Sequence, residues 1–143
     1  KDEIRLAKLF FKANSLYGAE THKKAFSGYS IEILTIHYKG FNNLMKAASK
    51  FKDSEIIDPE KHYKNKSDIL RLLNESKKSS LILIDPVQKN RNITAVVSKA
   101  NFDKLIKLAK SYSKNKSEKF FIKKEIDPLK LKNLTIRYLD YNY

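Results

Sequence analysis

The sequence predicts a mostly α-helical domain, a bundle of helices with one or two short strands. Two observations carry this prediction. Apolar side chains recur at intervals of three and four residues along most of the chain, which is the period of an amphipathic helix. Apolar runs of strand length are few and short, and the clearest covers residues 81–84. With 143 residues, 41% of them hydrophobic, the chain amounts to about one domain with enough apolar surface for a core.

Three helices are expected in the first part of the chain. The first covers residues 2–14 and places its apolar residues at helical spacing. The second begins after Ser27, because serine is a preferred N-cap residue, and continues to about Tyr38. The third covers residues 42–51, and the acidic stretch with Pro59 that follows it indicates a loop.

The middle of the chain is expected to alternate between helix and strand. Ser67 is the expected cap of a fourth helix, which holds the apolar residues within 69–73. Residues 81–84 are expected to form a buried strand, since a polar serine and an Asp-Pro pair bound this apolar run. Helical periodicity then returns after Ser98, the expected cap of a fifth helix.

The carboxyl end changes in composition. A polar linker is expected from Ser111, followed by strands at residues 120–122 and 134–138. This is the one credible domain boundary in the chain. We therefore expect a central domain over residues 1–117, and a linker with the start of a truncated C-terminal domain over residues 118–143.

The charge balance points to a polyanionic partner. Thirty Lys and Arg residues against 16 Asp and Glu residues give a net charge of +14, which suits nucleic acid or nucleotide phosphates. The absence of cysteine excludes disulfides and thiolate metal sites. No apolar run approaches the ~20 residues of a membrane span, so we expect no membrane association and a cytoplasmic protein.

A stripe of cations is expected along the first helix, at intervals of four, three and four residues. Its members are Lys1, Arg5, Lys8 and Lys12. Such a stripe can be an ordinary solvent-facing surface. However, Tyr17 and Gly18 follow the helix directly, so a phenol can stack on a base or ribose beside the ammonium groups, while the glycine allows close backbone approach. These residues are candidates for nucleotide or RNA binding.

Arg91 is a second candidate. It lies just after the expected strand at 81–84, on a loop of the kind that often holds ligands. Its guanidinium offers a planar fork of donors for phosphate oxygens, which lysine cannot imitate. The alternative is that Asp85 and Arg91 pair merely to hold their own turn.

The sequence offers no convincing catalytic centre. The acidic cluster that could gather Mg²⁺ falls in an expected loop, where a solvated connection is the better interpretation. Its members are Asp53, Glu55, Asp58 and Glu60. The three histidines lack the spacing of a zinc site, and the sequence has neither a P-loop nor a Gly-x-Ser-x-Gly motif.

Several segments, in order and at similar spacing, resemble the central domain of archaeal-type (class I) CCA-adding enzymes, the tRNA nucleotidyltransferases. The segments are residues 6–14, 16–20, 26–34, 36–38, 84–98 and 118–121. More distantly, the arrangement is similar to the substrate-binding central domains of poly(A) polymerases and oligoadenylate synthetases. Gln88 departs from the family pattern, which has an acid there.

The resemblance implies a helical domain that forms a cleft with an upstream catalytic head domain, absent from this chain. The cleft would hold ATP or CTP and the tRNA 3′ end. Lys8, Tyr17 and Arg91 match the family's nucleotide-binding residues, and Lys12 and Asp85 would support them. Mg²⁺ would be bound by carboxylates of the head domain, so this chain alone is expected to be inactive. The resemblance also allows a homodimer of the parent enzyme.

Two other functions remain open at this point. The chain could be a stand-alone RNA-binding or interaction module whose net charge simply follows phosphate. It could also be the central domain of another template-independent polymerase, such as a poly(A) polymerase.

Overall fold

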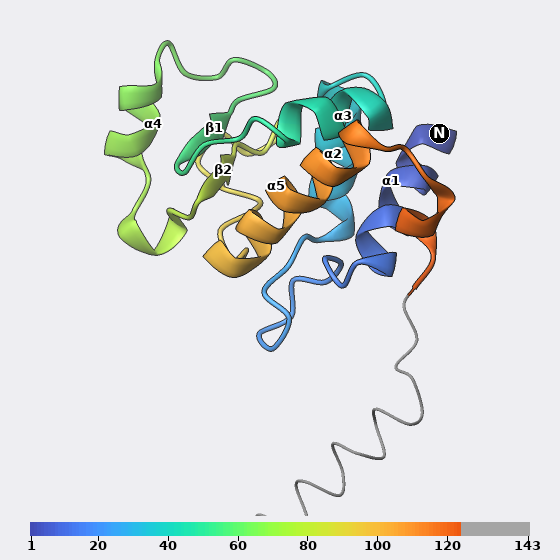
Figure 1. The fold of residues 1–143 in the computed structure, drawn as a ribbon. Helices are drawn as coiled ribbons and strands as arrows, with labels where there is room; N and C mark the ends of the chain where they lie inside the picture. The colour runs from blue at the N-terminus through green and yellow to red at the C-terminus, as the bar shows by residue number, and fades with distance from the viewer. Residues whose placement is uncertain (124–143) are drawn as a thin grey trace, which may run out of the picture.

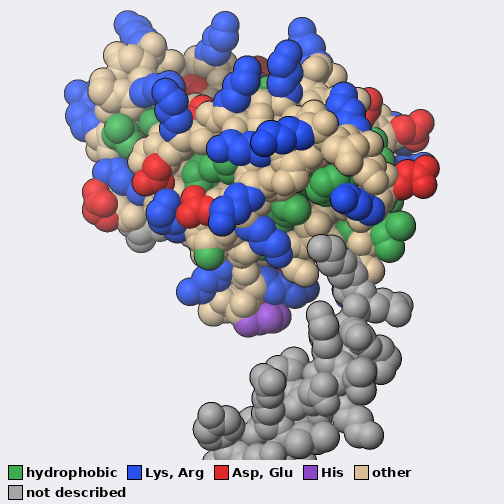
Figure 2. Space-filling view, in the orientation of Figure 1, with side chains coloured by type: hydrophobic (Ala, Val, Ile, Leu, Met, Phe, Trp, Pro, Cys, Tyr) green, Lys and Arg blue, Asp and Glu red, His purple; other side chains and the backbone are tan. Residues whose placement is uncertain are grey.

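A computed structural model describes residues 1–123 of the chain. Four helices, α1, α2, α3 and α5, pack together as a bundle, and α4 lies beside it with a small sheet (Figure 1). The helices are α1 (Asp2–Ala13), α2 (Gly28–His37), α3 (Phe41–Ala48), α4 (Lys66–Leu72) and α5 (Lys99–Lys114). The strands β1 (Glu55–Ile57) and β2 (Leu81–Leu83) pair in parallel. The predicted fold class, a mostly helical bundle with short strands, is confirmed. Lys and Arg side chains are spread over the visible face (Figure 2).

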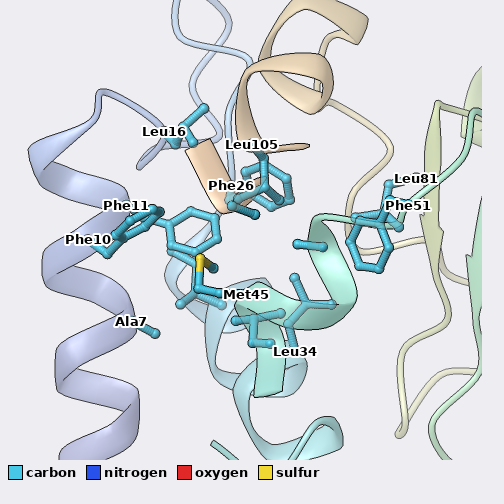
Figure 3. Close-up of a cluster of buried hydrophobic side chains, with 14 of the residues drawn as sticks. Ala7, Phe10, Phe11, Leu16, Phe26, Leu34, Met45, Phe51, Leu81 and Leu105 are labelled. Atoms are coloured by element: carbon cyan, nitrogen blue, oxygen red, sulfur yellow. The ribbon is translucent and has the colours of Figure 1, made fainter. Parts of the chain in front are cut away.

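Phenylalanine builds the core of the bundle. Phe10 and Phe11 of α1 are both fully buried (Figure 3). The ring of Phe10 lies 5.2 Å from that of Phe41 at the start of α3, and the ring of Phe11 lies 5.1 Å from that of Phe26, measured between centroids. Tilted and edge-to-face pairs of this kind add attraction beyond the buried area. They hold α1, which carries Lys8, firmly against the rest of the bundle.

Side-chain caps define where three helices begin. Ser27 and Ser98 cap α2 and α5 as predicted, each accepting a hydrogen bond from the backbone N–H three residues later at 3.1 Å. The cap predicted for α4 is wrong, because Asn65 rather than Ser67 accepts from the Asp68 N–H, at 2.9 Å. Asn65 has the extended backbone that an N-cap needs, whereas Ser67 already lies within the first helical turn.

The small sheet is only partly visible in the sequence. The strand predicted at residues 81–84 is confirmed, since β2 forms there and is fully buried. Its partner β1 lies within the stretch predicted as an acidic loop, with Glu55 opposite Leu81 and Ile57 opposite Leu83. A strand of three residues with one acidic member is too short to show a period of its own. Pairing with a buried strand makes it extended.

The carboxyl end differs from the prediction in two respects. Helix α5 continues past Ser111 to Lys114 because Tyr112 is buried, so the polar linker does not begin at Ser111. The strand predicted at residues 120–122 is wrong, since the 3-10 turn η2 (Glu118–Phe121) forms there and packs beside α1 (Figure 1). A strand would send two adjacent phenylalanines to opposite faces, whereas this turn places both against the core. The strand predicted at 134–138 lies outside the described residues.

Candidate functional site

The first turns of α2 bring the separate candidates together. Lys8 comes from α1 and Tyr17 from the turn after it, whereas Asp85 and Arg91 follow β2. A β-carbon built on Gly28, the first residue of α2, would lie 2.8 Å from the Tyr17 hydroxyl oxygen and 3.8 Å from Cε of Lys8. The tyrosine hydroxyl and the lysine stem therefore converge on the start of α2.

Lys8 is held by an ion pair that crosses from α1 to α2. Its Nζ donates to Oε1 of Glu32 at 2.6 Å, and both side chains are partly exposed. The hydrogen bond to Glu32 raises the pKa of Lys8, although partial burial opposes this. The lysine is thus a fixed cation at the surface. The ammonium has three donors, of which the bond to Glu32 uses one.

The cationic stripe on α1 divides into two parts. Lys1 and Arg5 are exposed, and Arg5 makes only a 3.9 Å contact with Asp2, which fits an ordinary solvent-facing surface. Lys8 contacts Glu32 instead, and Nζ of Lys12 lies 4.8 Å from the centroid of the Tyr17 ring. A cation at this distance is attracted by the face of the ring. The second half of the stripe therefore belongs to the candidate site.

Tyr17 is set in place by a closed loop. The N–H of Gly18 donates to the carbonyl of Phe26, and the carbonyl of Gly18 accepts from the N–H of Ala25, both at 2.8 Å. Gly18 has φ of 125°, which only glycine adopts readily. A β-carbon there would also lie 2.7 Å or less from side-chain atoms of Glu20 and Lys23. The glycine is thus required by the loop that positions the tyrosine.

A buried Asp85 pairs with a half-exposed Arg91 beyond the end of β2. The Asp85 side chain is 3% exposed, and its Oδ2 accepts from Nη1 of Arg91 at 3.2 Å. Its Oδ1 accepts from the Tyr29 hydroxyl and from the Val87 N–H, both at 2.9 Å. Burial alone would raise the pKa of Asp85, but its hydrogen bonds outweigh burial and hold the pKa below the usual value. Asp85 is a charged anchor.

The pairing of Asp85 with Arg91 shows that these residues do hold their own turn. The N–H of Asp85 also donates to the carbonyl of Arg91 at 3.0 Å, which closes the same loop. Nevertheless, the Arg91 side chain remains 54% exposed. Its five donors allow one bond to Asp85 and others to a ligand. The structural and the binding interpretation are therefore compatible, and the ligand role stays a prediction.

Sequence reasoning missed Tyr29 and Glu32 as members of this site. They lie three residues apart on α2. Glu32 contacts Lys8, in the half of the site that comes from α1, and Tyr29 contacts Asp85, in the half that follows β2. One signal was present in the sequence, because Glu32 is the only acidic residue in an otherwise largely apolar helix. Nothing in the sequence indicated that its partner would be Lys8.

A cavity of about 640 Å³ opens beside Tyr17. This volume lies within the range of small-molecule sites. Its lining residues are Leu9, Lys12, Ala13, Ser15, Tyr17, Lys23, Phe121 and Lys123. The lining contains three lysines and no acid, which favours an anion with an apolar part. Of the predicted site residues, Lys12 and Tyr17 line this cavity, whereas Lys8, Asp85 and Arg91 lie outside its lining.

Within residues 1–123, no three side chains of the His, Cys, Asp and Glu types gather closely enough to hold a metal ion. The acidic stretch around β1 therefore does not form such a group. Across the same residues, no helix combines the length and the apolar character needed to cross a membrane.

Comparisons with known proteins identify relatives of this chain. The family model described as "tRNA nucleotidyltransferase, second domain" matches residues 2–122. The CCA-adding enzyme of Nanoarchaeum equitans is 47% identical over 113 residues, which cover 78% of this chain and 28% of that protein. The CCA-adding enzymes of Picrophilus torridus and Saccharolobus shibatae are 38% and 41% identical, and the matches cover 97% and 85% of this chain.

The chain spans less than a third of the length of these relatives, between 27% and 30%. The family match nevertheless extends over most of the chain and includes all five predicted site residues, Lys8, Lys12, Tyr17, Asp85 and Arg91. The chain therefore belongs to the family of tRNA nucleotidyltransferase second domains.

Proposed function

We propose that this chain is the central domain of a CCA-adding enzyme, which adds C, C and A to the 3′ end of tRNA from CTP and ATP. Its matched relatives carry that name. One structural observation carries the proposal. Three candidate side chains converge on the first turns of one helix, α2. The Lys8 ammonium contacts Glu32 and the Tyr17 hydroxyl lies beside Gly28, whereas Arg91 is linked to Tyr29 through Asp85.

Each residue has a positioning role in this proposal. Lys8 neutralises triphosphate charge, and Tyr17 packs on the nucleotide or donates a hydrogen bond to it. Arg91 directs the donors that Asp85 does not use toward the base, which gives it a part in nucleotide selection. Lys12 and Asp85 support Tyr17 and Arg91, as their contacts indicate.

The chemical step belongs to the parent enzyme. The tRNA 3′-hydroxyl would attack the α-phosphate of the nucleotide and give up its proton to solvent. A P–O bond would form to the α-phosphorus, the bond from this phosphorus to the oxygen that bridges to the β-phosphate would break, and pyrophosphate would leave. Mg²⁺ would activate the hydroxyl and stabilise the leaving group, and we assign it to carboxylates of the head domain, as the family resemblance implies. This chain alone would position nucleotide and tRNA without catalysing.

The outward face of α5 is the surface we propose for the tRNA backbone. Four exposed lysines follow one another on it at intervals of three, three and four residues: Lys104, Lys107, Lys110 and Lys114. The opposite face of α5 is buried against the bundle. In Figure 2, Lys and Arg side chains lie over the side of the molecule on which α5 runs. A row of cations suits the phosphates of an acceptor stem.

Three further points belong to the same proposal and stay predictions. They are the division of the chain into residues 1–117 and 118–143, a homodimer of the parent enzyme, and a cytoplasmic location, which would follow from a tRNA substrate.

Nucleotide kinetics of the full-length protein test the site. We expect Lys8→Ala to raise the KM for both CTP and ATP, and Arg91→Ala to weaken discrimination of C and A against other bases. Arg5→Ala is the matched control, because Arg5 lies on the same stripe of α1 but outside the site. Unchanged kinetics in both site variants would contradict the assignment.

The products distinguish the other functions. On tRNA that lacks its CCA end, a CCA-adding enzyme stops after three nucleotides, whereas a poly(A) polymerase continues with A. Salt-sensitive RNA binding without any affinity for nucleotides would instead favour a stand-alone RNA-binding module.

A further inference from the structure

Helix α2 contacts both halves of the candidate site through two side chains. Glu32 holds the Lys8 ammonium at 2.6 Å, and Tyr29 donates to Asp85 at 2.9 Å, while Asp85 holds Arg91 at 3.2 Å. Lys8, which we propose for the phosphates, and Arg91, which we propose for the base, are thus linked through one short segment of α2. Neither contact is local in the sequence, since Lys8 and Glu32 are 24 residues apart and Tyr29 and Asp85 are 56 residues apart.

The geometry of a helix sets the spacing of these two contacts. Residues three apart lie on the same face, and a rise of about 1.5 Å per residue separates their origins by about 4.5 Å along the axis. The helix itself is firmly placed, since Ile31 and Leu34 are fully buried and Ser27 caps its first turn. The side chains of Tyr29 and Glu32 therefore extend from a helix that is fixed in place.

The two contacts have different chemistry. Burial and the bond to Asp85 raise the pKa of Tyr29, so the phenol keeps its proton and remains a donor. Glu32 is a charged partner that is itself partly exposed. Loss of the Tyr29 hydroxyl would therefore remove one of the two hydrogen bonds to Oδ1 of Asp85, leaving that from the Val87 N–H, and would loosen the orientation of the Asp85–Arg91 pair. Loss of the Glu32 charge would free the Lys8 ammonium to move.

We propose that Tyr29 and Glu32 are positioning residues held on one helix, α2, with Tyr29 orienting Arg91 toward the base through Asp85 and Glu32 orienting Lys8 toward the phosphates of the nucleotide. The inference rests on the proposed function. It assigns base selection to the Tyr29 branch and triphosphate affinity to the Glu32 branch. Each branch can therefore be altered separately.

Tyr29→Phe tests the first branch in the full-length protein. The variant keeps the ring and removes only one hydrogen bond to a charged group, for which we expect about a tenfold loss of discrimination against wrong bases. The KM for CTP and ATP should change much less. In an Arg91→Ala background the same substitution should have no further effect on discrimination, because Tyr29 acts through Arg91. An equal effect in both backgrounds would overturn this branch.

Glu32→Gln tests the second branch. We expect the KM for CTP and ATP to rise together by about threefold to tenfold, with base discrimination unchanged, because Lys8 loses its charged partner. Glu32→Asp should recover part of this loss, and a Lys8→Ala background should abolish it. Glu60→Gln, an exposed acid outside the site, is the matched control. A lower KM in Glu32→Gln would show that Glu32 competes with phosphate, and would overturn the positioning role.

The outcomes separate this inference from the proposed function. One outcome is that Lys8→Ala and Arg91→Ala alter nucleotide kinetics while Tyr29→Phe and Glu32→Gln change only the melting temperature. In that case the positioning role of Tyr29 and Glu32 is wrong and the site assignment stands. If all four variants retain wild-type nucleotide binding and kinetics, the site assignment itself fails. A selective effect of Tyr29→Phe on base discrimination, together with a selective effect of Glu32→Gln on KM, would support the positioning role of these two residues.

Discussion

The hydroxyl oxygen of Tyr17 occupies the space beside Gly28 that a side chain would need. It lies 2.8 Å from the place of a β-carbon on Gly28, whereas real β-carbons essentially never approach another atom closer than 3.0 Å. Gly28 is the first residue of α2 and carries no positive φ, so the conflict is steric rather than a matter of backbone strain. The absence of a side chain at residue 28 lets Tyr17 reach the site.

We therefore expect Gly28→Ala to displace the Tyr17 hydroxyl and to raise the KM for nucleotide severalfold. In a Tyr17→Phe background the conflict disappears, since the ring carbon Cζ would remain at an ordinary 3.6 Å. There Gly28→Ala should stabilise the domain by about 0.4–1 kcal/mol by restricting the unfolded chain. Melting curves and nucleotide kinetics of the double-mutant cycle measure both effects. Equal losses in the two backgrounds would contradict this steric account.

The stability of the domain should fall in acid through Asp85. Its hydrogen bonds lower its pKa in the folded state, below the value of about 3.9 for an unperturbed aspartate. Its contribution is thus present above about pH 4 and is lost as the pH falls through the folded-state pKa. We expect Asp85→Asn to lower the free energy of unfolding by about 1–3 kcal/mol at pH 7. The variant should also lose less stability than the wild type as the pH falls below about 4. Urea unfolding between pH 2 and pH 7 measures this, and an equal loss of stability in acid would exclude Asp85 as the cause.

Phe10 should be essential to the bundle, because it is fully buried and contacts aromatic rings of α3, α5 and η2. We expect Phe10→Ala to lower the free energy of unfolding by about 3–5 kcal/mol. Leu9→Ala is the matched control, since its neighbouring side chain is 50% exposed, and it should cost well under half as much. Chemical denaturation of both variants gives the comparison. Similar losses would place the core elsewhere.

The lysine face of α5 should determine the salt dependence of tRNA binding. Replacing Lys107, Lys110 and Lys114 by Gln should reduce the slope of log affinity against log salt by about 0.9 for each tRNA phosphate that a lysine no longer neutralises. The control is a triple Gln variant of Lys61, Lys64 and Lys66, which are exposed near α4 and change the net charge equally. Equal slopes in the two variants would show that net charge alone governs binding.

Local pattern was sufficient for much of the fold. The helices that carry Lys8 and Tyr29, the caps Ser27 and Ser98, and the buried strand at residues 81–84 could all be predicted. Periodicity and capping depend on neighbours within one or two turns, so the sequence displays them directly. The candidates Lys8, Tyr17 and Arg91 came from residue chemistry and from the family resemblance.

Long-range packing determined the remainder. Strand β1 exists because it pairs with β2, and η2 replaces a predicted strand because both of its phenylalanines pack on the bundle. Likewise, the contact of Glu32 with Lys8 and the contact of Tyr29 with Asp85 depend on how α2 lies between α1 and the end of β2. Such contacts join residues tens of positions apart. Their free energy comes from burial and charge in three dimensions, which no local period records.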